Sequence, residues 1–136
     1  AVRARHAAGG ARCLRPAAAP VGAGEPQWAR PCLERIRIGD ISVVSVVTQP
    51  WSDDANGELQ PGPACFLRIT RKGDVLGMHT SLDGETWRFV RTFGMALPET
   101  VKVGIHAQAP FVGGCLARFS QFTLSPTPVA DFRSGE

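Results

Sequence analysis

The sequence predicts an all-β protein, folded as an antiparallel sandwich or barrel. Short runs of β-branched and apolar residues recur between residues 33 and 126, and several alternate apolar with polar side chains, as half-covered strands do. The chain has 15 glycines and 11 prolines, many of which separate these runs, and no convincing apolar repeat of about 3.6 residues indicates a helix. A chain of 136 residues, of which 43% are hydrophobic, suffices for one domain with a core.

The first expected strands surround a long loop. The run Ile41–Thr48 is β-branched and apolar on both faces, which predicts a strand covered on both sides. Pro50–Pro63 contains Asn56-Gly57 and is typical of a turn-rich loop. Cys65–Arg71 alternates apolar with polar residues, and Val75–Ser81 is expected to return beside it as the second strand of a hairpin.

Three further strands complete a set of six. Asp83-Gly84 is the strongest hairpin signal in the chain and leads into Thr86–Arg91, with Trp87 expected beneath the turn. Residues 101–108 again alternate apolar with polar side chains. Leu116–Leu124 closes the set, with its phenylalanines expected in the core. Strands at this spacing, without a helix between them, indicate antiparallel pairing.

The first 32 residues differ from the rest in composition and charge. They hold five arginines and one acid, Glu25, whereas the other residues hold ten basic and eleven acidic side chains. Because no apolar period runs through them, we expect residues 1–32 to be a disordered or extended low-complexity leader. The sandwich domain would then span residues 33–126, followed by a C-terminal tail at residues 127–136.

Composition also narrows the expected partners. The arginines of the leader are dispersed without interleaved aromatic residues, so no nucleic-acid partner is expected. No window approaches the roughly 18 unbroken apolar residues of a membrane helix, and no apolar segment of about 7–15 residues indicates a secretory signal. We therefore expect no membrane partner and a cytoplasmic location.

Four motifs occur in an order that is typical of one known family. They are Val43-Val44-Ser45-Val46-Val47-Thr48 followed by Trp51-Ser52-Asp53; Leu67-Arg68-Ile69-Thr70-Arg71-Lys72-Gly73-Asp74; Ser81-Leu82-Asp83-Gly84-Glu85-Thr86-Trp87; and Val103-Gly104-Ile105 followed by Ala107-Gln108-Ala109-Pro110, with Cys115, Ala117, Phe119 and Phe122 after them. In these motifs the chain resembles the regulation of enolase protein 1-like domain-of-unknown-function family, over residues 36–125. The resemblance implies a concanavalin A-like jelly roll, the fold of lectins, glucanases and carbohydrate-binding modules.

The resemblance also implies more strands than the pattern shows. A jelly roll has about eight strands in two sheets, whereas six are visible here and Leu33–Ile38 supplies at most one more. Either the chain is a truncated product with exposed sheet edges, or the leader supplies strands that its composition does not reveal. The predicted fold class is thus an all-β antiparallel jelly-roll sandwich of concanavalin A-like type, complete only in the second case.

The candidate ligand-binding residues lie on the more polar faces of the expected strands. If their strands are neighbours, Arg68, His79, His106 and Gln108 project from one sheet face. A guanidinium and an amide suit the hydroxyl groups of a sugar, and Trp51 offers a flat aromatic surface for a sugar ring. The alternative is an ordinary solvated face, because antiparallel sheets commonly leave one face wet.

No residue pattern points to an active site or a metal centre. Glycoside hydrolysis needs two carboxylates about 5–10 Å apart across a groove, and the central acids fall in predicted loops. The acids of residues 53–58 lack the spacing of an EF-hand, so solvated turn residues are the better interpretation than a calcium site. The four cysteines lack the paired spacing of a zinc site, and Cys65 and Cys115 are expected as small buried residues. We expect no catalytic residue, no metal and no cofactor.

These observations favour a non-catalytic β-sandwich module that binds a carbohydrate-like ligand or regulates a metabolic protein. Its expected partner is accordingly a saccharide or a metabolic protein. Two alternatives stay open, a sugar-active enzyme and a truncated product without independent function. Paired acids in a groove would favour the enzyme. The sequence does not indicate an oligomeric state.

Overall fold

The chain forms ten β-strands in the computed structural model, which describes residues 2–6, 12–20, 27–37, 40–109 and 116–136. The strands are β1 (Val2–His6), β2 (Arg12–Pro20), β3 (Trp28–Arg37), β4 (Asp40–Thr48), β5 (Ser52–Leu59), β6 (Ala64–Lys72), β7 (Val75–Ser81), β8 (Arg88–Gly94), β9 (Val101–Ala107) and β10 (Ala117–Ser120). Within these described ranges, no helix is long and apolar enough to cross a membrane.

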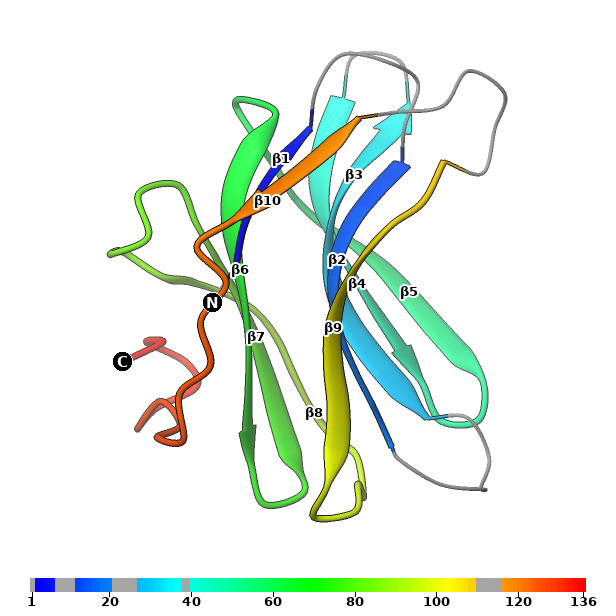
Figure 1. Cartoon of the computed structure of the whole chain (residues 1–136), viewed down its shortest axis with the longest axis vertical. Coiled ribbons are helices and arrows are strands. Elements are labelled where there is room, and N and C mark those ends of the chain that lie inside the picture. The colour runs from blue at the N-terminus through cyan, green and yellow to red at the C-terminus, as the bar shows by residue number, and fades with distance from the viewer. Residues whose placement is uncertain (1, 7–11, 21–26, 38–39, 110–115) are drawn as a thin grey trace.

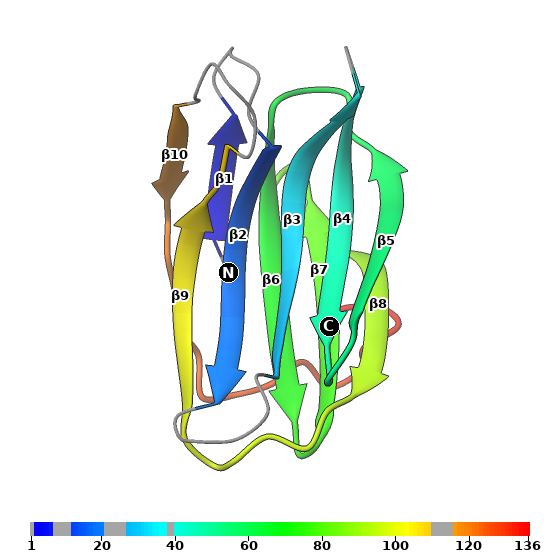
Figure 2. The ribbon, with the colours of Figure 1, turned by 90° about the vertical axis from the view of Figure 1, so that its right-hand side faces the viewer.

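The strands form two sheets that face each other as a sandwich (Figure 1). Sheet A has five strands in the order β10-β1-β6-β7-β8, and sheet B has five in the order β5-β4-β3-β2-β9. The pairings in both sheets are antiparallel. Figure 2 shows the molecule with sheet B toward the viewer. The prediction of an all-β antiparallel sandwich is confirmed.

The core fills the space between the two sheets. One buried cluster joins residues of β3, β4, β7 and the segment after β8: Ala29, Val47, Leu76, Met78, Met95 and Leu97. A second joins β3 and β4 to β6: Leu33, Val43, Cys65 and Leu67. Phe119 packs against this second cluster as expected, whereas Phe122 is 46% exposed because β10 ends at Ser120. Each buried leucine or methionine contributes about 1.5–3 kcal/mol, so these clusters hold the sheets together.

Strand β4 is covered on both faces, as its β-branched run predicts. Val43 and Val47 belong to the clusters between the sheets. Val44 and Val46 point to the opposite face of sheet B, where they are buried with Cys32. Successive side chains of β4 point to opposite faces of sheet B. Because both faces are covered, the strand lies in the interior of the protein.

The first 32 residues differ from the expected leader. Strands β1 and β2 lie in this stretch, and β3 begins at Trp28. β1 pairs with β6 and β10, and β2 pairs with β3 and β9, so both occupy interior positions in their sheets. Alanine, arginine and proline give β2 no alternating pattern, and in β1 the alternation covers only Val2-Arg3-Ala4-Arg5. Their pairing comes from neighbours that are distant in sequence, which is why composition conceals it.

The expected loop between Pro50 and Pro63 contains a strand as well. Residues 52–59 form β5, which pairs with β4 at the edge of sheet B. All eight of its residues are exposed. An edge strand of polar residues has no buried face, so no apolar alternation marks it in the sequence.

After β10 the chain returns along the outer face of sheet A, the face turned away from sheet B (Figure 1, orange to red). Its last residues close into a turn. The Asp131 N–H donates to the Glu136 carbonyl at 2.8 Å, and the Gly135 N–H donates to the Asp131 carbonyl at 3.0 Å. Residues 129–136 are called the C-terminal strap below.

Candidate ligand-binding face of sheet A

The candidate site lies on the outer face of β6 and β7, against the C-terminal strap. Arg68 and His79 stand opposite each other in the antiparallel register. Because side chains alternate along a strand and Leu67 and Met78 enter the core, Arg68 and His79 point outward. His79 is nevertheless 0% exposed, since the strap lies against its ring.

Two backbone carbonyls of the strap accept hydrogen bonds from this pair. His79 Nε2 donates to the Phe132 carbonyl at 2.8 Å, and Arg68 Nη2 donates to the Gly135 carbonyl. A carbonyl oxygen only accepts, so Nε2 of His79 must carry its proton. Burial lowers the pKa of His79, with a further lowering by the charge of Arg68, while the bond to Phe132 acts in the opposite direction. The imidazole is therefore neutral at pH 7.

Arg68 also stacks on Trp87. Its guanidinium carbon lies 3.9 Å from the centre of a Trp87 ring, within the range of a cation–π contact. The preceding turn places Trp87, because Asp83 Oδ1 accepts N–H bonds from Glu85 and Thr86 at 2.8 Å each. These bonds lower the pKa of Asp83. The interpretation of Asp83 as a turn residue is thus confirmed.

Phe132 anchors the strap to the sheet. Its ring lies against Gly77, where a Cβ atom would stand 2.6 Å from Phe132 Cδ1. Arg133 places its guanidinium carbon 4.5 Å from the ring centre of Phe89 on β8. The strap therefore spans β6, β7 and β8, and the absence of a side chain at Gly77 gives the aromatic ring its space.

A groove of ≈ 410 Å³ lies beside the Arg68–Trp87 stack. It is lined by Arg68, Ile69, Thr70, Arg71 and Trp87 and by the segment Thr123–Val129. Arg71 is engaged structurally, since it donates to the carbonyls of Leu97 and Pro98 at 2.6 Å each. No carboxylate occurs among these lining residues. Nor do the described residues contain a group of three His, Cys, Asp or Glu side chains that would hold a metal ion.

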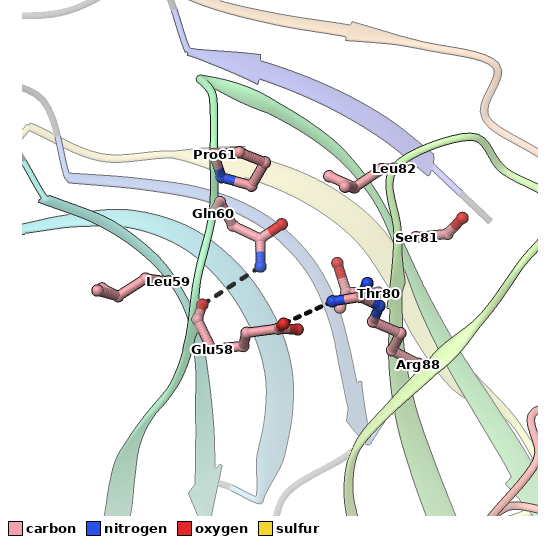
Figure 3. Close-up of a pocket in the computed structure, with 8 residues that line it drawn as sticks. All are labelled: Glu58, Leu59, Gln60, Pro61, Thr80, Ser81, Leu82 and Arg88. Atoms are coloured by element: carbon pink, nitrogen blue, oxygen red, sulfur yellow. Dashed lines mark hydrogen bonds and ion pairs between the residues drawn. The ribbon is translucent and has the colours of Figure 1, made fainter.

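A second cavity, next to β5 and β7, is too small for a ligand (Figure 3). Its volume is ≈ 20 Å³, which holds about one water molecule. Its carboxylate, Glu58, is paired with Arg88, and Gln60 Nε2 donates to the Glu58 carbonyl at 3.2 Å. A two-point ion pair between Arg91 and Asp53 (2.7 and 3.1 Å) joins β8 to β5 in the same way. These contacts tie the edges of the two sheets together.

Of the five predicted ligand-binding residues, the structure brings only two together, Arg68 and His79. His106 is exposed on β9, and Gln108 is exposed just beyond its end. Trp51 is 84% exposed in the turn between β4 and β5. β7 and β9 belong to different sheets, so the four polar side chains do not share a face. Alternation indicates which face a residue occupies, but it does not indicate the order of strands.

Two parts of this site were not predicted from the sequence, namely the stacking of Trp87 on Arg68 and the strap. A signal for the strap does exist. Asp131 is followed by Ser134 and Gly135, residues that favour turns, and Phe132 offers an apolar anchor among them. The pattern marks a turn but not the surface on which it lies.

Comparison with known proteins supports the fold and identifies the family. No curated protein matches the chain. The crystal structure of a functionally unknown protein from Saccharomyces cerevisiae is similar, with a TM-score of 0.80 and 24% sequence identity over 95% of this chain and 68% of that one. At this identity the likeness concerns the fold alone. A family model described as a protein of unknown function, DUF1349, matches residues 17–127 and thus begins within the stretch expected to be a leader. The chain therefore belongs to the DUF1349 family.

Proposed function

We propose that this protein is a non-catalytic β-sandwich module that binds a saccharide in the groove on the outer face of sheet A. The groove itself carries the proposal. It combines the Trp87 ring and the Arg68 guanidinium with threonine and serine residues of the segment that borders it. Saccharide sites need a flat apolar surface and a few polar groups, and this groove offers both.

The residues of the groove favour binding over hydrolysis. A glycoside hydrolase needs an acid and a second carboxylate across the scissile bond. The described lining residues include arginine, tryptophan, threonine and serine, but no aspartate or glutamate. A sugar-active enzyme is therefore the weaker candidate at this groove.

The motif resemblance supports the same proposal in finer terms. A concanavalin A-like jelly roll of the regulation of enolase protein 1-like type would place the protein among folds that include carbohydrate-binding modules. The resemblance makes regulation of a metabolic protein the second candidate. Val103 and Ile105, 42% and 46% exposed on the edge strand β9, favour it, because an edge with apolar side chains suits a protein partner.

The test is saccharide binding by the full chain and by two tryptophan variants. We expect the protein to bind at least one member of a glycan array, and Trp87→Ala to weaken that binding at least about tenfold in calorimetry, since stacking against the groove is lost. Trp51→Ala is the matched control, because Trp51 is exposed and does not line the groove. Unchanged binding by a Trp87→Ala variant that still melts cooperatively would contradict the proposed site.

A further inference from the structure

The strap provides a hydrogen-bond acceptor for only one of two neighbouring donors of Arg68. Its Nη2 donates to the Gly135 carbonyl, but its Nε is buried and has no hydrogen-bond partner. Nε and Nη2 lie on the same side of a guanidinium and form a two-pronged donor. One carbonyl oxygen matches one prong, whereas a carboxylate matches both.

Arg68 also has no ion-pair partner among the described residues. The ion pairs of this region join Arg88 to Glu58 and Arg91 to Asp53, and none reaches Arg68. The guanidinium instead faces neutral carbonyl oxygen and the ring of Trp87. A half-buried cation of this kind gains more from an anion than from a carbonyl, because charge-assisted hydrogen bonds are roughly twice as strong as neutral ones.

Hydrogen bonds between residues of the strap hold its turn together. The Asp131 carboxylate accepts the N–H groups of Arg133 and Ser134 at 3.0 and 2.9 Å, and the Gly135 N–H donates to the Asp131 carbonyl. These bonds lie within the strap. The strap meets the sheet through two carbonyls, the Phe132 ring and one cation–π contact.

We infer that the ligand of this face is an acidic saccharide, and that its carboxylate binds the Nε–Nη2 side of Arg68 in place of the C-terminal strap. This inference rests on the proposed saccharide function and specifies the ligand class. The sugar ring lies in the groove beside Trp87, and its carboxylate supplies the second acceptor that Arg68 lacks. The strap is then a built-in competitor, since its Gly135 carbonyl occupies the same donor.

A substitution at Gly135 should displace the strap from Arg68. A Cβ atom there would stand 2.9 Å from Arg68 Nη2, 3.0 Å from Trp87 Cβ and 3.1 Å from His79 Cδ2, and the residue has φ +81°. Gly135→Ala is therefore expected to displace the strap. Gly73→Ala is the matched control, because Gly73 has φ +61° but nothing within 4 Å of the added Cβ. It introduces similar backbone strain without a collision.

The experiment is a calorimetric titration of the full chain and its variants with a glucuronate-containing oligosaccharide and with its carboxyl-reduced neutral counterpart. We expect Gly135→Ala to bind the acidic sugar about tenfold more tightly than the unmodified chain, with little change for the neutral sugar and none for Gly73→Ala. Adding Arg68→Lys keeps the charge but removes the two-pronged donor, and should lower the affinity for the acidic sugar about tenfold.

Other results would contradict the inference alone or the proposed function as well. Equal affinities of Gly135→Ala for the acidic and the neutral sugar would overturn the inference while leaving the proposed function intact. No binding of either sugar by any folded variant would overturn both. If Gly135→Ala fails to fold, Phe132→Ala releases the strap by removing the ring on Gly77, and the lack of a gain in acidic-sugar affinity there would equally overturn the inference.

Discussion

The fold disfavours protonation of His79. Its ring is buried between the sheet and the strap, with Nε2 committed to the Phe132 carbonyl and Nδ1 without a partner. Protonation would add a charge beside Arg68, and the nearby carboxylate of Asp131 only partly offsets it. Burial accordingly lowers the pKa of His79 in the folded protein.

The stability of the protein should therefore fall as the pH falls from 7.5 to 5.5. The unfolded chain takes up the His79 proton near the ordinary pKa of about 6.5, whereas the folded protein resists it until a lower pH, so protons favour unfolding in this window. One group changes the free energy of unfolding by at most about 1.4 kcal/mol per pH unit. Urea unfolding at both pH values measures the effect. His79→Gln should flatten the dependence; parallel pH profiles for His79→Gln and the unmodified chain would exclude this role.

The alternation of apolar and polar residues was sufficient to predict that Arg68 and His79 share one face of their hairpin. Both flank residues that are buried in the core, so the sequence alone indicates their common face once the hairpin is recognised. Alternation was not sufficient to place His106, because the sheet to which its strand belongs is decided by topology, nor Trp51, which lies in a turn. Trp87 was expected beneath the Asp83 turn, but its ring stacks on Arg68, and the ring next to Gly84 is that of Phe66.

Among the elements, β5 shows how a turn-like sequence becomes a strand. At Gly57 the backbone of β5 lies close to that of β4: a Cβ atom there would stand 2.6 Å from the Val43 carbonyl oxygen. The β4–β5 register shifts between Ser42 and Val44, and Ser42 Oγ donates to the Gly57 carbonyl at 3.0 Å. The missing side chain of Gly57 lets the two backbones come close, and Asn56-Gly57 does not form the turn that the sequence predicts.

Gly57→Ala should consequently destabilise the edge of sheet B. The new Cβ meets backbone, which cannot rotate away, so we expect a loss of about 1–3 kcal/mol in unfolding free energy. Hydrogen exchange should be faster at the amides of β5. Gly104→Ala is the control, since Gly104 lies on the other edge strand with nothing within 4 Å of an added Cβ. A Gly57→Ala variant as stable as Gly104→Ala would show that β5 does not pack this closely.

The strands that the sequence predicted best are those with a buried face. Val75–Ser81 has the predicted bounds, and Ile41–Thr48 falls within β4, because burial imposes apolar residues at fixed intervals. β5 has no buried residue, β2 has no apolar alternation, and the alternation of β1 covers only a few residues with Val2 and Ala4 as its apolar positions. Their existence depends on hydrogen-bonding partners far away in the chain, and no local pattern records those partners.

For the whole molecule, the position of the first two strands matters more than their composition. β1 lies between β10 and β6, and β2 lies between β3 and β9. Without them β9 and β10 would lose the sheet neighbours that the structure describes. The sandwich therefore depends on the stretch whose alanine and arginine content suggested a leader.

A fragment of residues 33–136 should accordingly not fold as the complete chain does. It retains most core residues but lacks β1, β2 and the first half of β3, so it exposes the unpaired edges of β6, β9 and β10. We expect aggregation or a broad, non-cooperative thermal transition, measured by calorimetry and light scattering beside the full chain. A soluble monomeric fragment with a sharp transition would show that the first two strands are dispensable.

The same placement of β1 bears on how the protein is made. Val2 pairs with Leu67 of β6, and Arg3 pairs with Ser120 of β10, so the earliest of these strands to leave the ribosome acquires its second neighbour only after β10 has followed. Contacts between such distant residues form slowly, since long loops must close first. Sheet A can therefore be completed only after β10 has been synthesised, and until then its growing edges are open to chaperones and to other nascent chains.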